Sequence, residues 1–197
     1  MSHSQKRSRV AIAGLVGFAA LTLAACEEEK AEGHVFKSEA ECREEADKPN
    51  SWWTPQECAA SFAQAQDRHL NNAPRYDAVD VCEEQHGEGM CKSDVVPNTG
   101  GGGGIFMPLM AGYMIGNMMN GSNNYQSSRP LYPAKTGGFR TADGATKVNG
   151  LSGGASFSKR AFKPASATVN KAPMTKASIK SRGGFGTSRT SSRSFGG

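Results

Sequence analysis

The chain has 197 residues, with 23 Lys and Arg against 18 Asp and Glu and a formal net charge of +5. This small excess hides a division along the chain, since residues 26–98 carry 17 acidic and 7 basic residues and residues 99–197 carry 1 acidic and 13 basic. The second half is rich in Gly, Ser, Thr, Ala and Lys and lacks the apolar content that offsets the entropy of folding. Its composition excludes a second globular domain, so only the first half is expected to fold alone.

An export signal is predicted at residues 1–25. Lys6, Arg7 and Arg9 precede an uncharged, largely apolar run at 10–25, the layout of a secretory signal. The run has sixteen residues, whereas a membrane-spanning helix needs about 20. It ends in Leu-Ala-Ala-Cys26, which resembles the bacterial lipoprotein signal and predicts fatty acylation, such as by palmitate, of Cys26. The alternative is an ordinary signal cleaved nearby, with Cys26 left as an odd thiol.

An acylated Cys26 places the rest of the chain in the bacterial cell envelope, as a membrane lipoprotein facing the periplasm. The polar residues 26–34 are expected to be a tether between the lipid and the folded part. Glu27 rather than Asp follows the lipid-bearing Cys, which favours the outer membrane by resemblance to lipoprotein sorting.

Four more cysteines, an even number in a short exported segment, predict two disulfides; they are Cys42, Cys58, Cys82 and Cys91. Four cysteines allow three connectivities, and a hairpin of two helices favours Cys42–Cys58, with Cys82 then joined to Cys91. Zinc is the competing explanation for these cysteines. No Cys-x-x-Cys pair occurs in the sequence, so no metal site is predicted.

Capping signals predict three short helices around these cysteines. Ser38 and Glu41 form a capping box that opens a helix at 39–47, and Thr54, Pro55 and Glu57 open a second one that extends to about residue 71. A third helix is expected at 79–86, before Gly87. Residues 35–98 are therefore interpreted as an acidic, disulfide-stapled helical domain.

No catalytic residue or cofactor is predicted. His34, His69 and His86 have no Cys nucleophile beside them once the thiols are paired, and the carboxylates fall on helix faces that water would cover. Trp52 and Trp53 lie in the turn between the first two helices. They are either a ligand platform or part of the packing at the core or its rim.

The apolar stretch at 105–119 follows a glycine linker at 99–104 and contains no charge. It is interpreted as a helix with Met residues at steps of four on one side and Gly112 and Gly116 on the other. Gly-x-x-x-Gly allows two helices to approach closely, so these glycines are candidates for helix association with a partner, a second copy or the membrane. The alternative is a helix that covers the core of the acidic domain.

The last segment, residues 120–197, is expected to be a disordered basic tail. Its cations suit a polyanion, which in an envelope means anionic lipid, phosphorylated glycolipid or cell-wall carboxylates. Export disfavours nucleic acid as the partner, and the tail is alternatively a screen for the acidic head of its own molecule. The candidate polyanion-binding residues are Lys159, Arg160, Lys163, Lys180, Arg182, Arg189 and Arg193.

Several motifs resemble the YgiB family of uncharacterised bacterial envelope proteins. They are the lipoprotein-like start, the aromatic-x5-Cys units at Phe36 and Tyr76, the Met-rich run 107–114, and the glycine- and serine-rich end from Arg182. The resemblance implies a Gram-negative envelope protein with no assigned activity, often encoded beside an ATP-grasp ligase similar to glutathionylspermidine synthase.

The expected fold is a small α-helical, disulfide-stapled domain, a short apolar helix and a disordered tail. Two functions fit this organisation. One is a structural or interaction lipoprotein without catalytic activity. The other is an accessory protein that binds a cationic small molecule such as a polyamine, or that acts as a partner of the ligase.

Overall fold

The structure, a computed structural model, describes residues 29–94, 104–120 and 123–185. Its centre is a six-stranded sheet in the order β7-β6-β5-β4-β1-β8, in which every neighbouring pair is antiparallel. The strands are β1 (Lys30–Phe36), β4 (Gly112–Asn120), β5 (Asn123–Pro133), β6 (Phe139–Thr141), β7 (Lys147–Val148) and β8 (Gly153–Ser158). A separate antiparallel pair joins β2 (Cys91–Asp94) to β3 (Ile105–Pro108).

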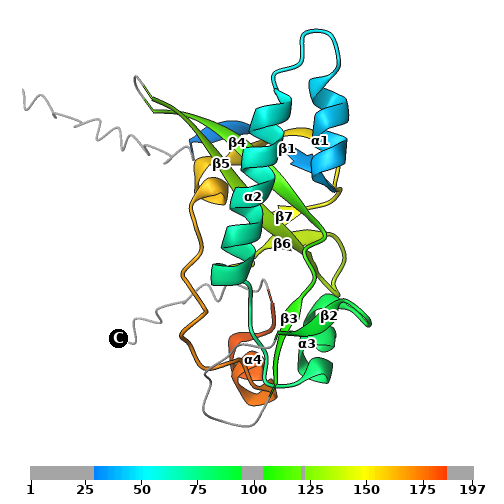
Figure 1. Ribbon diagram of the computed structural model, residues 1–197. Helices are drawn as coiled ribbons and strands as arrows, with labels where there is room; N and C mark the ends of the chain where they lie inside the picture. Colours follow the sequence, from blue (N-terminus) through cyan, green and yellow to red (C-terminus); the bar gives the residue numbers. More distant parts are fainter. Residues whose placement is uncertain (1–28, 95–103, 121–122, 186–197) are drawn as a thin grey trace, which may run out of the picture.

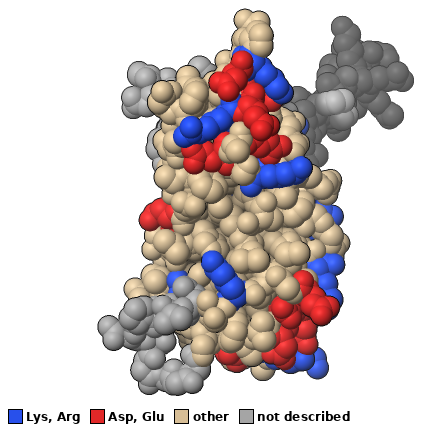
Figure 2. Space-filling model, turned by 45° about the vertical axis from the view of Figure 1, so that its right-hand side comes forward, with Lys and Arg blue, Asp and Glu red and all other residues tan. Residues whose placement is uncertain are grey.

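Helices α1 (Glu39–Ala46) and α2 (Pro55–Asn72) lie at one end of the molecule and along one face of the sheet (Figure 1). Helices α3 (Val79–His86) and α4 (Lys176–Arg182) lie at the other end, beside the β2–β3 pair. A 3-10 turn, η1 (Lys159–Phe162), follows β8. Figure 2 shows that most of the carboxylates visible in that view gather at the two ends, with a largely uncharged band between them.

The predicted fold class is wrong, because the molecule is built around a curled antiparallel sheet rather than a small helical domain. β1 lies between β4 and β8, so segments expected to be tether, apolar helix and tail share one sheet. The tether residues after Glu29 belong to β1, a strand with neighbours on both sides. Pairing between strands far apart in sequence leaves little signal in any one of them.

The predicted helix at 105–119 is instead strand β3, a short connection and strand β4. In β4 Tyr113 and Ile115 pack toward α1 and α2, whereas Met114 packs on the opposite face of the sheet. Both faces of β4 are therefore buried, and a strand buried on both faces reads as an unbroken apolar run. Such a run cannot be distinguished from a buried helix by periodicity alone.

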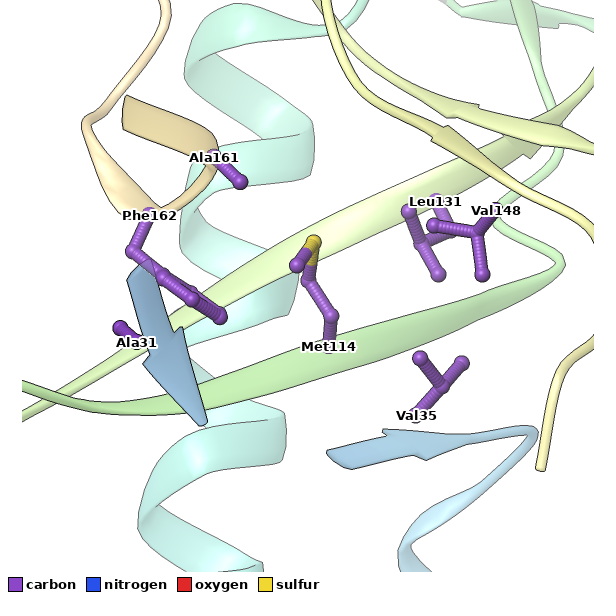
Figure 3. Packing of buried hydrophobic residues seen from close by; sticks show 7 residues of the cluster. All are labelled: Ala31, Val35, Met114, Leu131, Val148, Ala161 and Phe162. Atoms are coloured by element: carbon purple, nitrogen blue, oxygen red, sulfur yellow. The ribbon is translucent and has the colours of Figure 1, made fainter. Parts of the chain in front are cut away.

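The two glycines assigned to helix association instead lie in β4, where a neighbouring group occupies the space that a Cβ would need. A Cβ placed on Gly116 would lie 2.4 Å from the ring of Phe162, and one on Gly112 would lie 2.6 Å from the backbone oxygen of Phe36. Figure 3 shows the Phe162 ring and Met114 on this inner face, in a cluster with Val35. The other members of the cluster are Ala31, Leu131, Val148 and Ala161.

The predicted disorder of the tail is wrong for the residues that the structure describes between 123 and 185. This segment supplies four of the six strands and also α4. Phe162 is 1% exposed, and the Arg129 side chain is buried, donating from Nη1 to the Ala161 carbonyl oxygen at 2.9 Å. A few apolar side chains suffice here because the backbone of the segment pairs with β4 and β1.

The three predicted helices of the first half are confirmed as α1, α2 and α3. The Ser38 hydroxyl accepts a hydrogen bond from the Glu41 amide, and Thr54 and Glu57 form a complete capping box. Local capping chemistry is visible in the sequence because both partners lie within four residues. Among the described residues, no helix is both long enough and apolar enough to cross a membrane.

Candidate functional site: an acidic cleft with two tryptophans

A cleft of about 490 Å³ opens where the α1–α2 connection meets the edge of the sheet. The connection contributes Trp52 and Trp53, and β1 contributes Glu32 and His34. Trp52 is 82% exposed, which is unusual for a side chain of this size. An exposed indole at the rim of a carboxylate-lined cleft is available to a ligand rather than to the core.

The connection that carries the tryptophans is held at both of its ends. Cys42 of α1 is joined to Cys58 of α2 by a disulfide. Within the connection, the Trp53 amide donates to the Ser51 hydroxyl at 3.1 Å, and the Ser51 amide donates to the Lys48 carbonyl oxygen at 3.2 Å. These contacts hold the backbone next to Trp52 in place before any ligand arrives.

An aromatic cluster lies beside the cleft, formed by His34 and Phe36 of β1 and by Trp53 of the connection. The rings of His34 and Phe36 are stacked with centroids 4.4 Å apart, and Trp53 meets Phe36 edge-on at 6.0 Å. Burial lowers the pKa of the His34 imidazole, although Glu45 and Glu41 oppose this effect. His34 is therefore neutral at pH 7 and adds no positive charge to the cleft.

The charge around this cluster is mostly negative. The cleft and an adjoining hollow of about 460 Å³ share His34, Glu45 and Lys48. Lys48 is the single cation among their lining residues, and its Nζ lies 2.5 Å from Glu45 Oε2. The carboxylates are Glu32, Glu41, Glu44, Glu45 and Glu57.

Two of these carboxylates have no partner among the residues that the structure describes. Glu57 caps α2 through Thr54, and Glu41 accepts a hydrogen bond from the Ser152 hydroxyl. Glu32 and Glu44 form no ion pair with a described residue; Glu32 of β1 lines the cleft, and Glu44 of α1 lines the adjoining hollow. The arrangement suits a cation that contacts carboxylates and an indole face together.

Both disulfides have the predicted pairing, because Cys82 of α3 is joined to Cys91 of β2 as Cys42 is to Cys58. Disulfide sulfurs are not zinc ligands. No cluster of three or more His, Cys, Asp or Glu within the described ranges is placed to hold a metal ion.

The candidate polyanion-binding residues are not brought to one place. Lys159 and Arg160 lie on η1, with Lys163 directly after it, whereas Lys180 and Arg182 lie on α4 at the other end of the molecule. Lys159 also forms an ion pair with Glu29 at 3.0 Å. Cys26, Arg189 and Arg193 lie outside the described residues.

The other two histidines belong to buried hydrogen-bond networks. His86 Nδ1 lies 2.7 Å from the Pro133 carbonyl oxygen and must donate to it, so Nε2 accepts from the Tyr76 hydroxyl at 2.8 Å. Burial lowers the pKa of His86 to about 4. His69 Nδ1 lies 3.0 Å from the Tyr132 hydroxyl. These rings stabilise the packing of α2 and α3 against the strands.

Glu32 lies in β1, within the segment predicted to be a tether, so the sequence alone does not place it in the site. A usable signal was present, since Lys30, Glu32 and His34 alternate with the buried Ala31, Gly33 and Val35. An alternation of period two predicts a strand with one polar face. The site depends on that face.

Comparison with known proteins gives the relationship of the chain. A family model described as "Protein of unknown function (DUF1190)" matches residues 30–196. The chain belongs to this family. The resemblance noted from the sequence motifs is thereby confirmed, and the family carries no assigned activity.

Curated relatives of this family include a UPF0441 protein of Serratia proteamaculans, 30% identical over 195 residues, which span 91% of this chain and 82% of that protein. A UPF0441 protein of Pectobacterium carotovorum is 30% identical over 193 residues, covering 90% and 80% of the two chains. One from Erwinia tasmaniensis is 29% identical over 178 residues, covering 86% and 77%. No solved structure matches the chain significantly.

Proposed function

We propose that this family member is a lipid-anchored envelope protein that binds a cationic small molecule in the cleft between the α1–α2 connection and β1. The observation that carries the proposal is the exposed Trp52 indole beside carboxylates that lack ion-pair partners. Cation–π contact favours an organic ammonium over a metal ion, because the ring faces attract weakly hydrated cations.

A molecule with several ammonium groups on an apolar chain, such as a polyamine, fits the cleft best. Glu32 and Glu44 offer two separated negative charges, while Trp52 and Trp53 offer apolar surface for the methylene groups between them. A compact divalent cation would use the carboxylates but not the indoles. The same reasoning favours ligand binding over a purely structural role, since Tyr113, Met114 and Ile115 of the apolar segment assigned to partner contacts are buried.

The location in the envelope rests on the sequence around Cys26. A basic start, a short apolar run and Leu-Ala-Ala-Cys together support acylation and an anchor facing the periplasm. Replacement of Cys26 by Ser is expected to abolish incorporation of a labelled fatty acid. Labelling that persists in the Ser variant would rule out the anchor and leave the cleft proposal unaffected.

The cleft has a built-in reporter, because both tryptophans of the chain lie in it. Titration of the mature chain with spermidine should change the tryptophan fluorescence, and the effect should weaken as salt is raised. Magnesium at equal ionic strength should produce little change. A spermidine titration without a fluorescence change at low salt would overturn the proposal.

Matched variants separate specific binding from general charge attraction. Trp52→Ala should weaken spermidine about two- to fivefold, the range expected for an exposed cation–π contact, with Trp53 left as the reporter. Glu32→Gln should weaken it as well. Glu88→Gln removes an exposed carboxylate that lines neither hollow and should leave the affinity unchanged. Equal losses in the two Glu variants would show that the cleft is not the site.

A further inference from the structure

A second cavity lies at the opposite end of the molecule from the tryptophan cleft and has the opposite charge. Its volume is about 390 Å³, and its walls come from the end of α2, from α3 and from the segment 165–185 that includes α4. Three cations line it, Arg75, Lys171 and Arg182, against the single carboxylate of Asp143.

Arg75 distinguishes this cavity from an ordinary basic surface. Arg75 is one of the residues that line the cavity, although it is only 4% exposed. Nη2 donates to the Leu70 carbonyl oxygen at 2.8 Å, but Nε and Nη1 have no hydrogen-bond partner. A buried guanidinium with unused donors is rare, because burying a charge is costly unless the charge is paired.

The position of Arg75 is fixed by its backbone. The Arg75 carbonyl oxygen accepts from the Met174 amide at 2.7 Å, and Tyr76 exchanges both of its backbone hydrogen bonds with Phe106. The segment around Thr168, which also lines the cavity, is held in place because the Thr168 hydroxyl donates to the Ala73 carbonyl oxygen at 2.6 Å. The backbone of Arg75 and the segment around Thr168 are therefore both held in place beside the cavity.

The lone carboxylate of the cavity does not neutralise Arg75. Asp143 Oδ2 forms an ion pair with Arg129 at 3.3 Å, while Oδ1 accepts from the Thr141 hydroxyl at 2.6 Å and from the Ala145 amide. These contacts hold the pKa of Asp143 below its usual value although burial opposes them. The Asp143 charge is thus already committed to Arg129, and the cavity keeps an excess of positive charge.

We propose that this cavity binds a small molecule that carries an oxyanion, a carboxylate or a phosphate, on an apolar body, with Arg75 as the principal contact to the oxyanion. Nε and Nη1 provide charge-assisted donors, and a guanidinium recognises both kinds of head group. Lys171 adds a second cation at the exposed side. The remaining lining is largely apolar, with Pro74, Met174, Ile179 and Phe185, and this surface suits the body of the ligand.

The test uses three probes that share one apolar body and differ in the head group: hexanoate, hexyl phosphate and hexanol. Calorimetry of the mature full-length chain should detect the two anions and not the neutral alcohol. A stronger signal for one anion identifies the head group as carboxylate or phosphate. Failure of both anions to bind, or binding of hexanol as tight as that of the anions, would overturn the proposal.

Variants assign the binding to the cavity. Arg75→Met should raise the Kd of the anions at least about tenfold, because it removes a charge-assisted contact. The same variant should not lower the melting temperature of the unliganded chain, whereas a purely structural Arg75 would lower it on removal. Unchanged anion affinity in a folded Arg75→Met chain would refute the role of Arg75.

A second pair of variants keeps the test decisive even if Arg75→Met does not fold. Lys171→Met alters an exposed lining residue and should weaken the anions severalfold. Lys147→Met removes an exposed cation that does not line the cavity and should leave their Kd unchanged. Equal behaviour of these two variants would mean that only general positive charge is involved, which contradicts the proposal. Because these probes are anions, failure here leaves the cation-binding cleft untouched.

Discussion

At the residue scale, the packing on the inner face of the sheet depends on glycines, which have no side chain. Gly33 and Gly116 face each other across β1 and β4, and a Cβ on either would lie within 2.6 Å of the Phe162 ring. Phe162 thus occupies space that two glycines leave open. The Gly-x-x-x-Gly spacing at 112–116 lies in a strand, where Gly116 accommodates the Phe162 ring and Gly112 the close backbone of Phe36.

The variant Gly116→Ala should therefore destabilise the chain by about 1–3 kcal/mol, the usual cost of overpacking a filled core. Gly150→Ala is the matched control, because nothing lies within 4 Å of the Cβ that it would add. Urea denaturation of both variants measures the difference. Phe162→Leu in the Gly116→Ala background should recover part of the loss, and a lack of any recovery would argue against the ring as the cause.

A second prediction at the residue scale concerns the buried His86. Its pKa is lowered by burial from 6.5 to about 4, so the unfolded chain takes up a proton at this residue at a higher pH than the folded chain does. Between these values the unfolded state binds more protons, and stability falls as the pH falls. The loss should amount to roughly 3 kcal/mol once the pH is below 4.

The measurement is the free energy of unfolding from pH 7 to pH 4, compared with that of His86→Gln. The variant should be less stable at pH 7, because it loses the contacts to Tyr76 and Pro133, but its stability should depend less on pH. His34→Gln serves as a control for the other histidine whose pKa is lowered. Equal pH dependence in the parent and the His86 variant would contradict the assignment.

At the scale of elements, the helices were predictable and most strands were not. Helices α1 and α2 begin at capping residues that lie within a few positions of each start and are visible in the sequence. Strand β4 has no comparable capping signal. Its Met and Gly residues fit a helical period of four as well as a strand period of two. The decisive information is the pairing with β1 and β5, which is non-local.

The residues of the candidate sites likewise divide into those that the sequence indicates and those that depend on contacts between distant segments. The tryptophans stand out in the sequence because they lie in a turn between two capped helices. Glu32 and the cavity around Arg75 depend on which distant segments the sheet brings together, and composition alone assigned the segment around Lys171 and Arg182 to disorder. A low apolar content misleads here, since Phe162 and Ile179 are buried against elements formed by other parts of the chain.

The disulfide between α1 and α2 is the element-scale feature with the clearest test. It closes a loop of 16 residues, for which the chain-entropy treatment gives about 3 kcal/mol of stabilisation. The double variant Cys42→Ala/Cys58→Ala should lower the free energy of unfolding by that order. It should also weaken spermidine binding, because the connection that carries Trp52 is no longer constrained by the disulfide. Unchanged spermidine affinity in a destabilised chain would show that the disulfide stabilises the fold but does not position Trp52 for binding.

At the scale of the whole molecule, the acidic and basic halves of the sequence form one structure. Strands β4 and β8 of the basic half pair with the two sides of β1. The two cavities at opposite ends of the molecule have linings of opposite charge. The tryptophan cleft draws its carboxylates from the first half. The Arg75 cavity takes Lys171 and Arg182 from the second half. The uneven distribution of charge in the sequence thus contributes to two cavities whose linings differ in charge.

This organisation predicts that the acidic half does not fold alone. A chain that ends at residue 98 keeps α1, α2, α3 and both disulfides, but β1 loses β4 and β8 and the Phe36 side of the sheet loses Tyr113 and Ile115. A chain that ends at Val148 keeps β4 but loses Phe162, whose removal alone is worth about 3–5 kcal/mol as a buried aromatic. That loss is comparable to the whole stability of many domains, about 5–15 kcal/mol.

Both tryptophans are present in the full mature chain and in the two truncated chains, so near-UV circular dichroism and fluorescence report the same residues in all three. The full chain should unfold in urea with a cooperative transition. The chain ending at residue 98 should show no cooperative transition, and the chain ending at Val148 a weak one at lower urea. A cooperative transition of the shortest chain at the midpoint of the full chain would show that the helices and disulfides are sufficient without the sheet. Because β1 lines the cleft, spermidine binding should disappear together with that transition.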